Sequence, residues 1–274
     1  MSTINTNVQS LNAQRNLAAS SGALSTSMQR LSSGLRVNSA KDDSAGLAIA
    51  ERMNAQVKGM NVAIRNANDG ISLAQTAEGA LGKVGDSLQR MRELAVQSAN
   101  GSNSENDRIN LDAEYQQLAL EVSRVLDGTK FNGTNLLNAD ETLTFQVGAN
   151  NVLEDQIDIE TTDLGGGTGI TDSVGGNLLE AADALEAMDN LDLAIDEITT
   201  ARATFGAVQN RFESVIANLQ VAAENQAASR GRIMDADFAV ETSNLSRGQI
   251  LQQAGTAMIA QANQLPQGVL SLLR

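Results

Sequence analysis

The chain has 274 residues and a formal net charge of −14, with no Cys, no His, no Trp, one Tyr and one Pro. The lack of Cys excludes disulfides and thiolate chemistry, and the lack of His removes the commonest general base and metal ligand, which closes most enzyme mechanisms. The acidic balance argues against nucleic acid as a partner, because phosphate neutralisation needs a basic surface.

The charges are unevenly distributed along the chain. Residues 1–40 carry three arginines and residues 243–274 carry two, and neither end contains an acid. This distribution is expected if the two ends are buried together in an assembly while the acidic middle faces water. It is also expected if the ends are disordered polar tails. Charge alone leaves both interpretations open.

Hydrophobic periodicity near the N-terminus favours the assembly interpretation. Positions at steps of four and three predict an amphipathic helix that ends near Gly34, and they are Leu17, Ser21, Leu24, Met28, Leu31 and Leu35. A polar turn over residues 38–44 follows. Asp42, Asp43 or Ser44 is expected to cap the next helix.

The stretch from Met53 to Ala95 predicts one long helix without a proline. Its apolar seam repeats about every 3.5 residues and comprises Met53, Val57, Met60, Ile64, Ala67, Ile71, Ala74, Ala77, Leu81, Val84, Leu88, Met91 and Ala95. Such a helix is on the order of 65 Å long, so other long helices must lie beside it.

A short loop at residues 100–104 leads into a further predicted helix, which we expect to be antiparallel to the long one. Its seam comprises Leu111, Tyr115, Leu118, Val122 and Val125. Small β-hairpins are predicted over residues 129–160, where an Asn132-Gly133 turn signal precedes two alternating stretches. Residues 164–177 are predicted to be a Gly-rich loop.

Helical periodicity returns at Leu191 and continues to Gln226. A second polar junction, residues 232–237, precedes a last helix expected to end at Pro266. Its seam comprises Leu251, Ala254, Met258, Ala262 and Leu265. The predicted fold class is mainly α: a long antiparallel helical bundle or coiled-coil rod with a small β-hairpin region, plus paired N- and C-terminal helices.

Candidate sites of other kinds fail on their spacing. Residues 165–169 lack the last glycine and the context of a dinucleotide-binding loop, and Gly82-Lys83 lacks the flanking residues of a P-loop. The Asp pairs at 42–43 and 235–237 lack further calcium ligands. The sequence therefore predicts no catalytic residue, no cofactor and no metal. No apolar run is long enough for a membrane span, and a cleaved signal peptide is not expected.

Three stretches closely resemble bacterial flagellin, the subunit family of the flagellar filament. They are residues 4–7, residues 31–46, and residues 250–258 with their continuation over 266–274. The resemblance implies an extracellular structural subunit that polymerises helically into a hollow tube used for swimming. By analogy, residues 1–42 and 232–274 form an inner coiled-coil domain around the channel, and residues 43–231 form an outer rod.

The resemblance also implies partners. Besides copies of itself, these are the flagellar cap, hook-junction and export-chaperone proteins, with export through the flagellar secretion apparatus. The resemblance also implies that the apolar seam residues of the two terminal helices mediate assembly between copies. Because only residues 164–177 stand where many relatives carry large outer domains, the chain is similar to a minimal flagellin. A missing His disfavours the flagellins that carry an inserted metalloprotease domain.

A further partner implied by the resemblance is the mammalian Toll-like receptor for flagellin. Residues 89–94 resemble the segment that this receptor binds, and Glu114 stands at the matching place on the next helix. Because Leu88, Met91 and Ala95 are assigned to the interior, we expect Gln89, Arg90, Leu94 and Glu114 to offer an exposed binding flank. The alternative is that this flank serves only packing between subunits.

Two other functions remain open at this stage. A flagellar hook-filament junction protein shares the terminal helices and is the nearest alternative. A secreted coiled-coil effector that inserts into membranes needs a longer apolar run than this chain has. Filament formation by the purified chain separates the first interpretation from both.

Overall fold

The computed structural model describes residues 6–271, and their side chains as far as residue 264. It is predominantly helical with a small β region, as predicted. Contacts divide the chain into unit 1, residues 1–55 and 225–274, and unit 2, residues 56–224. The predicted domain limits near residues 42 and 231 stay a prediction. Among the helices of the described part, none combines the length and apolarity needed to cross a membrane.

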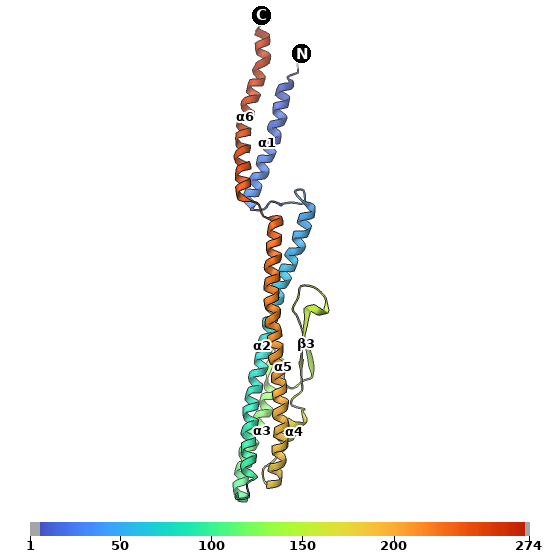
Figure 1. Cartoon of the computed structure of the whole chain (residues 1–274), viewed down its shortest axis with the longest axis vertical. Coiled ribbons are helices and arrows are strands. Elements are labelled where there is room, and N and C mark those ends of the chain that lie inside the picture. Colours follow the sequence, from blue (N-terminus) through green and yellow to red (C-terminus); the bar gives the residue numbers. More distant parts are fainter. Residues whose placement is uncertain (1–5, 272–274) are drawn as a thin grey trace. The chain divides into compact units, whose positions relative to one another are not determined.

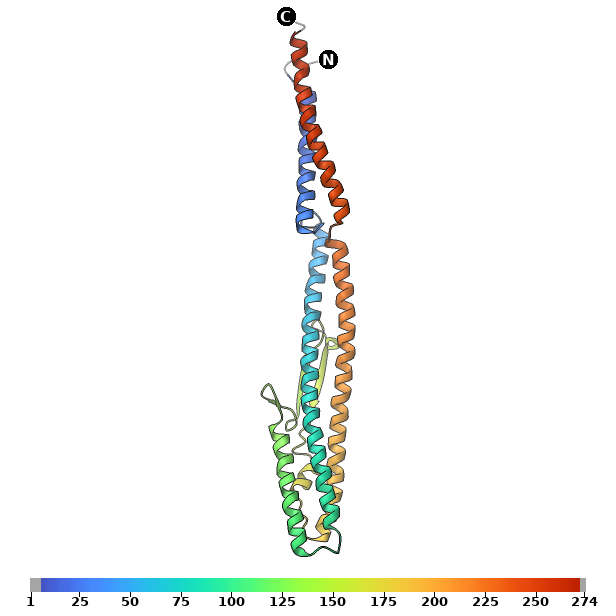
Figure 2. The same cartoon turned by 90° about the vertical axis from the view of Figure 1, so that its left-hand side faces the viewer.

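Unit 2 is built on three long helices that lie side by side in Figures 1 and 2. Helix α2 (Ser44–Ser98) has 55 residues, and α3 (Glu105–Gly128) and α5 (Ala181–Met234) pack along it. The predicted long helix is therefore confirmed. Its predicted seam is buried except at Met53, Val57, Ile64 and Ile71, which are half-buried. The core of the unit includes Leu81, Leu88, Met91, Tyr115, Val122, Leu191, Ile198 and Phe212.

The turn between α2 and α3 is fixed by a capping box. Ser104 Oγ accepts a hydrogen bond from the Asp107 amide at 3.3 Å, and Asp107 Oδ2 accepts one from the Ser104 amide at 3.0 Å. The Ser104 hydroxyl also donates to Asp107 Oδ2, at 2.7 Å, and this bond and the one from the Ser104 amide lower the pKa of Asp107. The short polar loop predicted at residues 100–104 is confirmed, and it reverses the chain direction.

The β region consists of two antiparallel strand pairs. Strand β1 (Lys130–Phe131) pairs with β2 (Thr134–Asn135) across Asn132 and Gly133, whose φ angles of 49° and 89° fit a type I′ turn. Strand β3 (Glu141–Gln146) pairs with β4 (Gln156–Thr161), and the 3-10 helix η1 (Leu153–Asp155) lies in their connection. Phe145 of β3 meets Phe212 of α5 edge to face at 5.7 Å. The predicted hairpin region is confirmed.

The Gly-rich loop predicted over residues 164–177 is wrong in its middle, where the chain forms helix α4 (Thr168–Gly175). Ile170 is buried, and a Cβ on Gly169 would come within 2.8 Å of the Ala194 backbone nitrogen of α5. The Tyr115 hydroxyl donates to the Ser173 carbonyl at 2.6 Å. Glycine serves close packing here, and composition cannot distinguish that role from flexibility.

In unit 1, α1 (Val8–Ser33) and α6 (Phe238–Ser271) lie side by side (Figures 1 and 2). Helix α1 ends where Gly34 adopts the left-handed conformation, with φ 71°. Asp43 caps α2, because its Oδ1 accepts a hydrogen bond from the Gly46 amide at 2.8 Å. Contrary to the prediction, α6 continues beyond Pro266 to Ser271.

Candidate assembly surfaces

A close-packed seam joins α1 to α6 within the chain. Leu17 and Leu24 of α1 lie against Gly255 and Gly248 of α6, where an added Cβ would come within 2.9 and 3.0 Å of the leucine Cδ1 atoms. The next contact along α1, Ser27, is also small and buried. Small residues let the two helices approach closely, so the pairing needs few large side chains and leaves others outside it.

Asn7 ties the start of α1 to α6. Its Oδ1 accepts a hydrogen bond from the Ser10 amide at 3.1 Å and caps α1, while its Nδ2 donates to the Ala262 carbonyl at 2.7 Å. Pro266 stands four residues after Ala262 and has no N–H to offer that carbonyl. Asn7 therefore supplies the missing donor, which explains why α6 continues through its proline.

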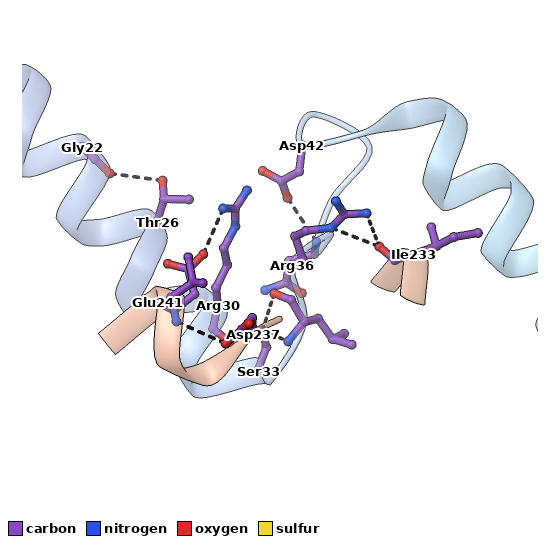
Figure 3. Close-up of polar contacts among 12 residues, drawn as sticks. Gly22, Thr26, Arg30, Ser33, Arg36, Asp42, Ile233, Asp237 and Glu241 are labelled. Carbon is purple, nitrogen blue, oxygen red and sulfur yellow. Dashed lines mark hydrogen bonds and ion pairs between the residues drawn. The ribbon is translucent and has the colours of Figure 1, made fainter. Parts of the chain in front are cut away.

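A buried ion pair holds the other end of this helix pair (Figure 3). Arg30 Nη1 of α1 donates to Glu241 Oε1 of α6 at 3.1 Å, and Glu241 is only 5% exposed. Burial by itself raises the pKa of Glu241. The Ser27 hydroxyl and the Arg30 guanidinium outweigh burial, and the pKa of Glu241 ends below its ordinary value. The sequence prediction missed this pair, although Glu241 directly precedes the acid-free end.

The junction between the helices is tied by backbone hydrogen bonds. The Arg36 amide donates to the Met234 carbonyl at 2.7 Å, and the Arg36 guanidinium donates to the Ile233 carbonyl at 2.7 Å (Figure 3). Leu35 packs here against Val37 and Met234. It was predicted on the helical seam of α1, but α1 ends at Ser33 and Leu35 has left the helix.

Large apolar side chains of α1 and α6 remain exposed in the single chain. They are Val8, Leu11, Met28, Phe238, Val240, Ile250, Leu251 and Met258. A groove of about 570 Å³ between the helices adds Ala13, Leu17 and Gly255 to this surface. Leu251 and Met258 line this groove as well, and large exposed apolar side chains that gather in this way mark an interaction site.

The predicted assembly residues divide into two groups. Leu17, Leu24, Leu31 and Ala262 are half-buried or buried within the chain, and Met28, Leu251, Ala254 and Met258 are exposed. The side chain of Leu265 lies outside the described residues. A single heptad seam therefore does not describe α1 or α6. Each helix has apolar residues that face its partner helix and other apolar residues that are exposed to solvent in the single chain.

The α2 and α3 residues predicted to bind a receptor are brought together only in part. Arg90 Nη2 lies 2.8 Å from Glu114 Oε1 and Arg90 Nη1 lies 2.9 Å from Glu93 Oε2, and Gln89 is exposed beside them. These contacts raise the pKa of Arg90, chiefly through the hydrogen bond to Glu114.

Leu94 was predicted to be exposed on this flank, and that prediction is wrong. Its side chain is 1% exposed and belongs to the core of unit 2. Helix α2 packs against neighbours on two sides, so its buried stripe is wider than one seam and includes both Leu94 and Ala95.

The sequence matches two family descriptions that together span most of the chain. Residues 4–142 match the bacterial flagellin N-terminal helical region, and residues 188–273 match the bacterial flagellin C-terminal helical region. Flagellin from Halalkalibacterium halodurans is 46% identical over 273 residues, covering 99% of each chain. The flagellar filament 33 kDa core protein of Treponema phagedenis is 42% identical over 285 residues, also covering 99% of each.

A solved structure agrees with these matches. The crystal structure of Bacillus cereus flagellin is 34% identical, with a TM-score of 0.51 over 61% of this chain and 94% of that one. The near full-length identity to filament proteins favours a filament subunit over a hook-filament junction protein. The chain therefore belongs to the bacterial flagellin family, whose members are structural subunits of the extracellular flagellar filament.

Proposed function

We propose that the α1–α6 pair is the surface through which copies of this flagellin join into the filament. The observation that carries the proposal is the set of large apolar side chains that the pair leaves exposed, Leu251 and Met258 among them. The absence of acids from residues 1–40 and 243–274 supports it, because carboxylates are costly to desolvate between packed copies. Burial of these side chains between copies supplies the driving force for polymerisation.

Substitution of the exposed side chains tests this proposal without disturbing the fold. Leu251→Gln with Met258→Gln should leave the helix content and stability of the monomer nearly unchanged, because surface changes typically alter the free energy of unfolding by less than about 0.5 kcal/mol. Sedimentation should show that filaments no longer form. Leu120→Gln on α3, where the leucine is also exposed, serves as the control. Filaments at the wild-type critical concentration in the double variant would overturn the proposal.

The remaining partners follow the family. We infer export as an unfolded chain through the flagellar secretion apparatus, with a chaperone before export and with cap and hook-junction proteins at the filament ends. The absence of Cys supports this route, since no disulfide needs to be broken before threading. The inferred role is structural and not enzymatic.

A second proposal is that monomers bind the host Toll-like receptor for flagellin through Gln89, Arg90 and Glu114. The observation in its favour is that Arg90 and Glu114, from different helices, form one exposed ion pair at 2.8 Å. With Leu94 buried, the contact surface is polar and its apolar support comes from elsewhere, such as the half-exposed Val96 beside Gln89. Packing of subunits against the same flank hides it in intact filaments.

A further inference from the structure

A basic ridge crosses the exposed face of α2 within unit 2. Lys58, Val62 and Arg65 are spaced by four and three residues, which places them on one side of the helix. All three are exposed, and neither Lys58 nor Arg65 forms an ion pair with any described residue. Asp69, one turn beyond Arg65, also forms no ion pair with a described residue.

An acidic groove of about 650 Å³ lies elsewhere on unit 2, between α5 and the segment that leads into α4. Its apolar part includes Leu164 and Phe205, and Leu193 stands at its edge with 57% of its surface exposed. Its four carboxylates, Glu160, Asp163, Asp196 and Glu197, form no ion pair within the described part of the chain. Glu197 Oε2 also lacks a hydrogen-bond donor among the residues that the structure describes.

The two surfaces complement each other in charge and in apolar character. The ridge presents an apolar side chain, Val62, between two cations, and the groove presents apolar side chains among carboxylates. We propose that the ridge Lys58–Val62–Arg65 of one copy docks into the acidic groove of the next copy in the filament. The proposal rests on filament assembly and adds a second, electrostatic contact to the one made by α1 and α6.

The positions of the two surfaces decide what such a contact builds. Gly85 of α2 lies against Ile198 of α5, so the groove stands level with that part of α2. Val62 is 23 residues away along the helix, an offset of roughly 35 Å at 1.5 Å per residue. Because ridge and groove are different surfaces, the contact is heterologous, and in an open filament it repeats from copy to copy and staggers successive copies by this offset.

Cysteine cross-linking tests the contact directly, because the natural chain contains no Cys. Val62→Cys and Leu193→Cys are made as separate variants, polymerised singly and together, and treated with a short bismaleimide. Each variant alone should give only monomers on a denaturing gel, and the mixture should give dimers. A chain with both substitutions should give a ladder of multimers. Leu120→Cys, exposed on α3, combined with Leu193→Cys is the control that should give none.

The proposed contact would be overturned if the mixture formed intact filaments without cross-linked dimers, or if either single variant gave dimers. Both results would leave the filament function in place. Failure of the wild-type chain to polymerise would count against the filament function itself. If a cysteine variant does not polymerise, Asn61→Cys with Thr204→Cys repeats the test at neighbouring exposed positions.

A charge swap gives an independent readout. Arg65→Glu and Asp196→Lys should each raise the critical concentration for polymerisation about tenfold, as expected for like charges facing each other, and should restore it when combined. Lys83→Glu, on the exposed face of the same helix but outside the ridge, should change it little. A combined variant no better than either single variant would contradict the proposal.

Discussion

Replacement of Asn7 by Ala removes two hydrogen bonds that hold α1 and α6 in register. Loss of the cap on α1 costs about 1 kcal/mol, and the Ala262 carbonyl, in a residue only 7% exposed, loses its donor at a cost of about 1 to 3 kcal/mol. The expected destabilisation of the helix pair is therefore about 2 to 4 kcal/mol.

The proline makes this expectation specific. Pro266→Ala restores an N–H to the Ala262 carbonyl, so in that background Asn7→Ala should cost only the cap. The double-mutant cycle should give a coupling of about 1 to 3 kcal/mol between two residues that share this one carbonyl. Asn7→Asp keeps the oxygen that caps α1 but loses the donor to the Ala262 carbonyl. It should therefore lose only the stability that comes from this donor, which Pro266→Ala should restore.

Native-state hydrogen exchange of the monomer, read by mass spectrometry on peptides from α1 and α6, measures the opening free energy of the pair. Exchange in Asn7→Ala should be faster by about thirtyfold or more, and peptides of unit 2 should be unchanged and serve as the internal control. Additive effects of Asn7→Ala and Pro266→Ala would refute the assignment of Asn7 as donor to the proline-freed carbonyl.

Three further predictions concern pH and binding. The pKa of Glu241 is lowered in the folded chain, so ionised Glu241 stabilises the α1–α6 pair at a pH above the ordinary glutamate pKa of 4.5, and this stabilisation is lost as the pH falls through the folded pKa. Unfolding of the α1–α6 pair followed at pH 3 to 7 should show the loss, and Glu241→Gln should abolish this pH dependence. Burial and the nearby Asp112 raise the pKa of Tyr115, the single tyrosine, to about 12, so unit 2 should lose stability as the pH rises from about 10 to 12. Phenolate absorbance measures this directly, and a Tyr115 that titrates near 10 in the folded protein would contradict its burial in the core of unit 2. Arg90→Ala should weaken binding of monomers to the Toll-like receptor by on the order of 1 to 3 kcal/mol in a surface-plasmon measurement, with Arg124→Ala as a control and an unchanged Kd as the contrary result.

Much of the fold follows from periodicity. The spacing of the apolar residues from Met53 to Ala95 and the absence of proline were enough to predict α2. The capping residues set the ends of its neighbours. The Asn132-Gly133 turn likewise depends on local chemistry alone. Such features are readable because their cause lies within a few residues of the chain.

The predictions that failed depend on contacts between distant residues. Helix α6 passes Pro266 because Asn7, 255 residues before Ala262, supplies a donor. Leu94 is buried because α2 has neighbours on two sides, and α4 forms because Gly169 fits against α5. The Arg30–Glu241 pair was missed for the same reason, since only the folded chain brings the two residues together.

Electron cryomicroscopy of filaments grown from the purified chain shows whether the α1–α6 pair is the surface on which copies assemble. We expect a helical filament in which the side chains exposed in the single chain, Ile250, Leu251 and Met258, are buried between copies. A filament in which these side chains face solvent, with contacts made only through unit 2, would contradict it.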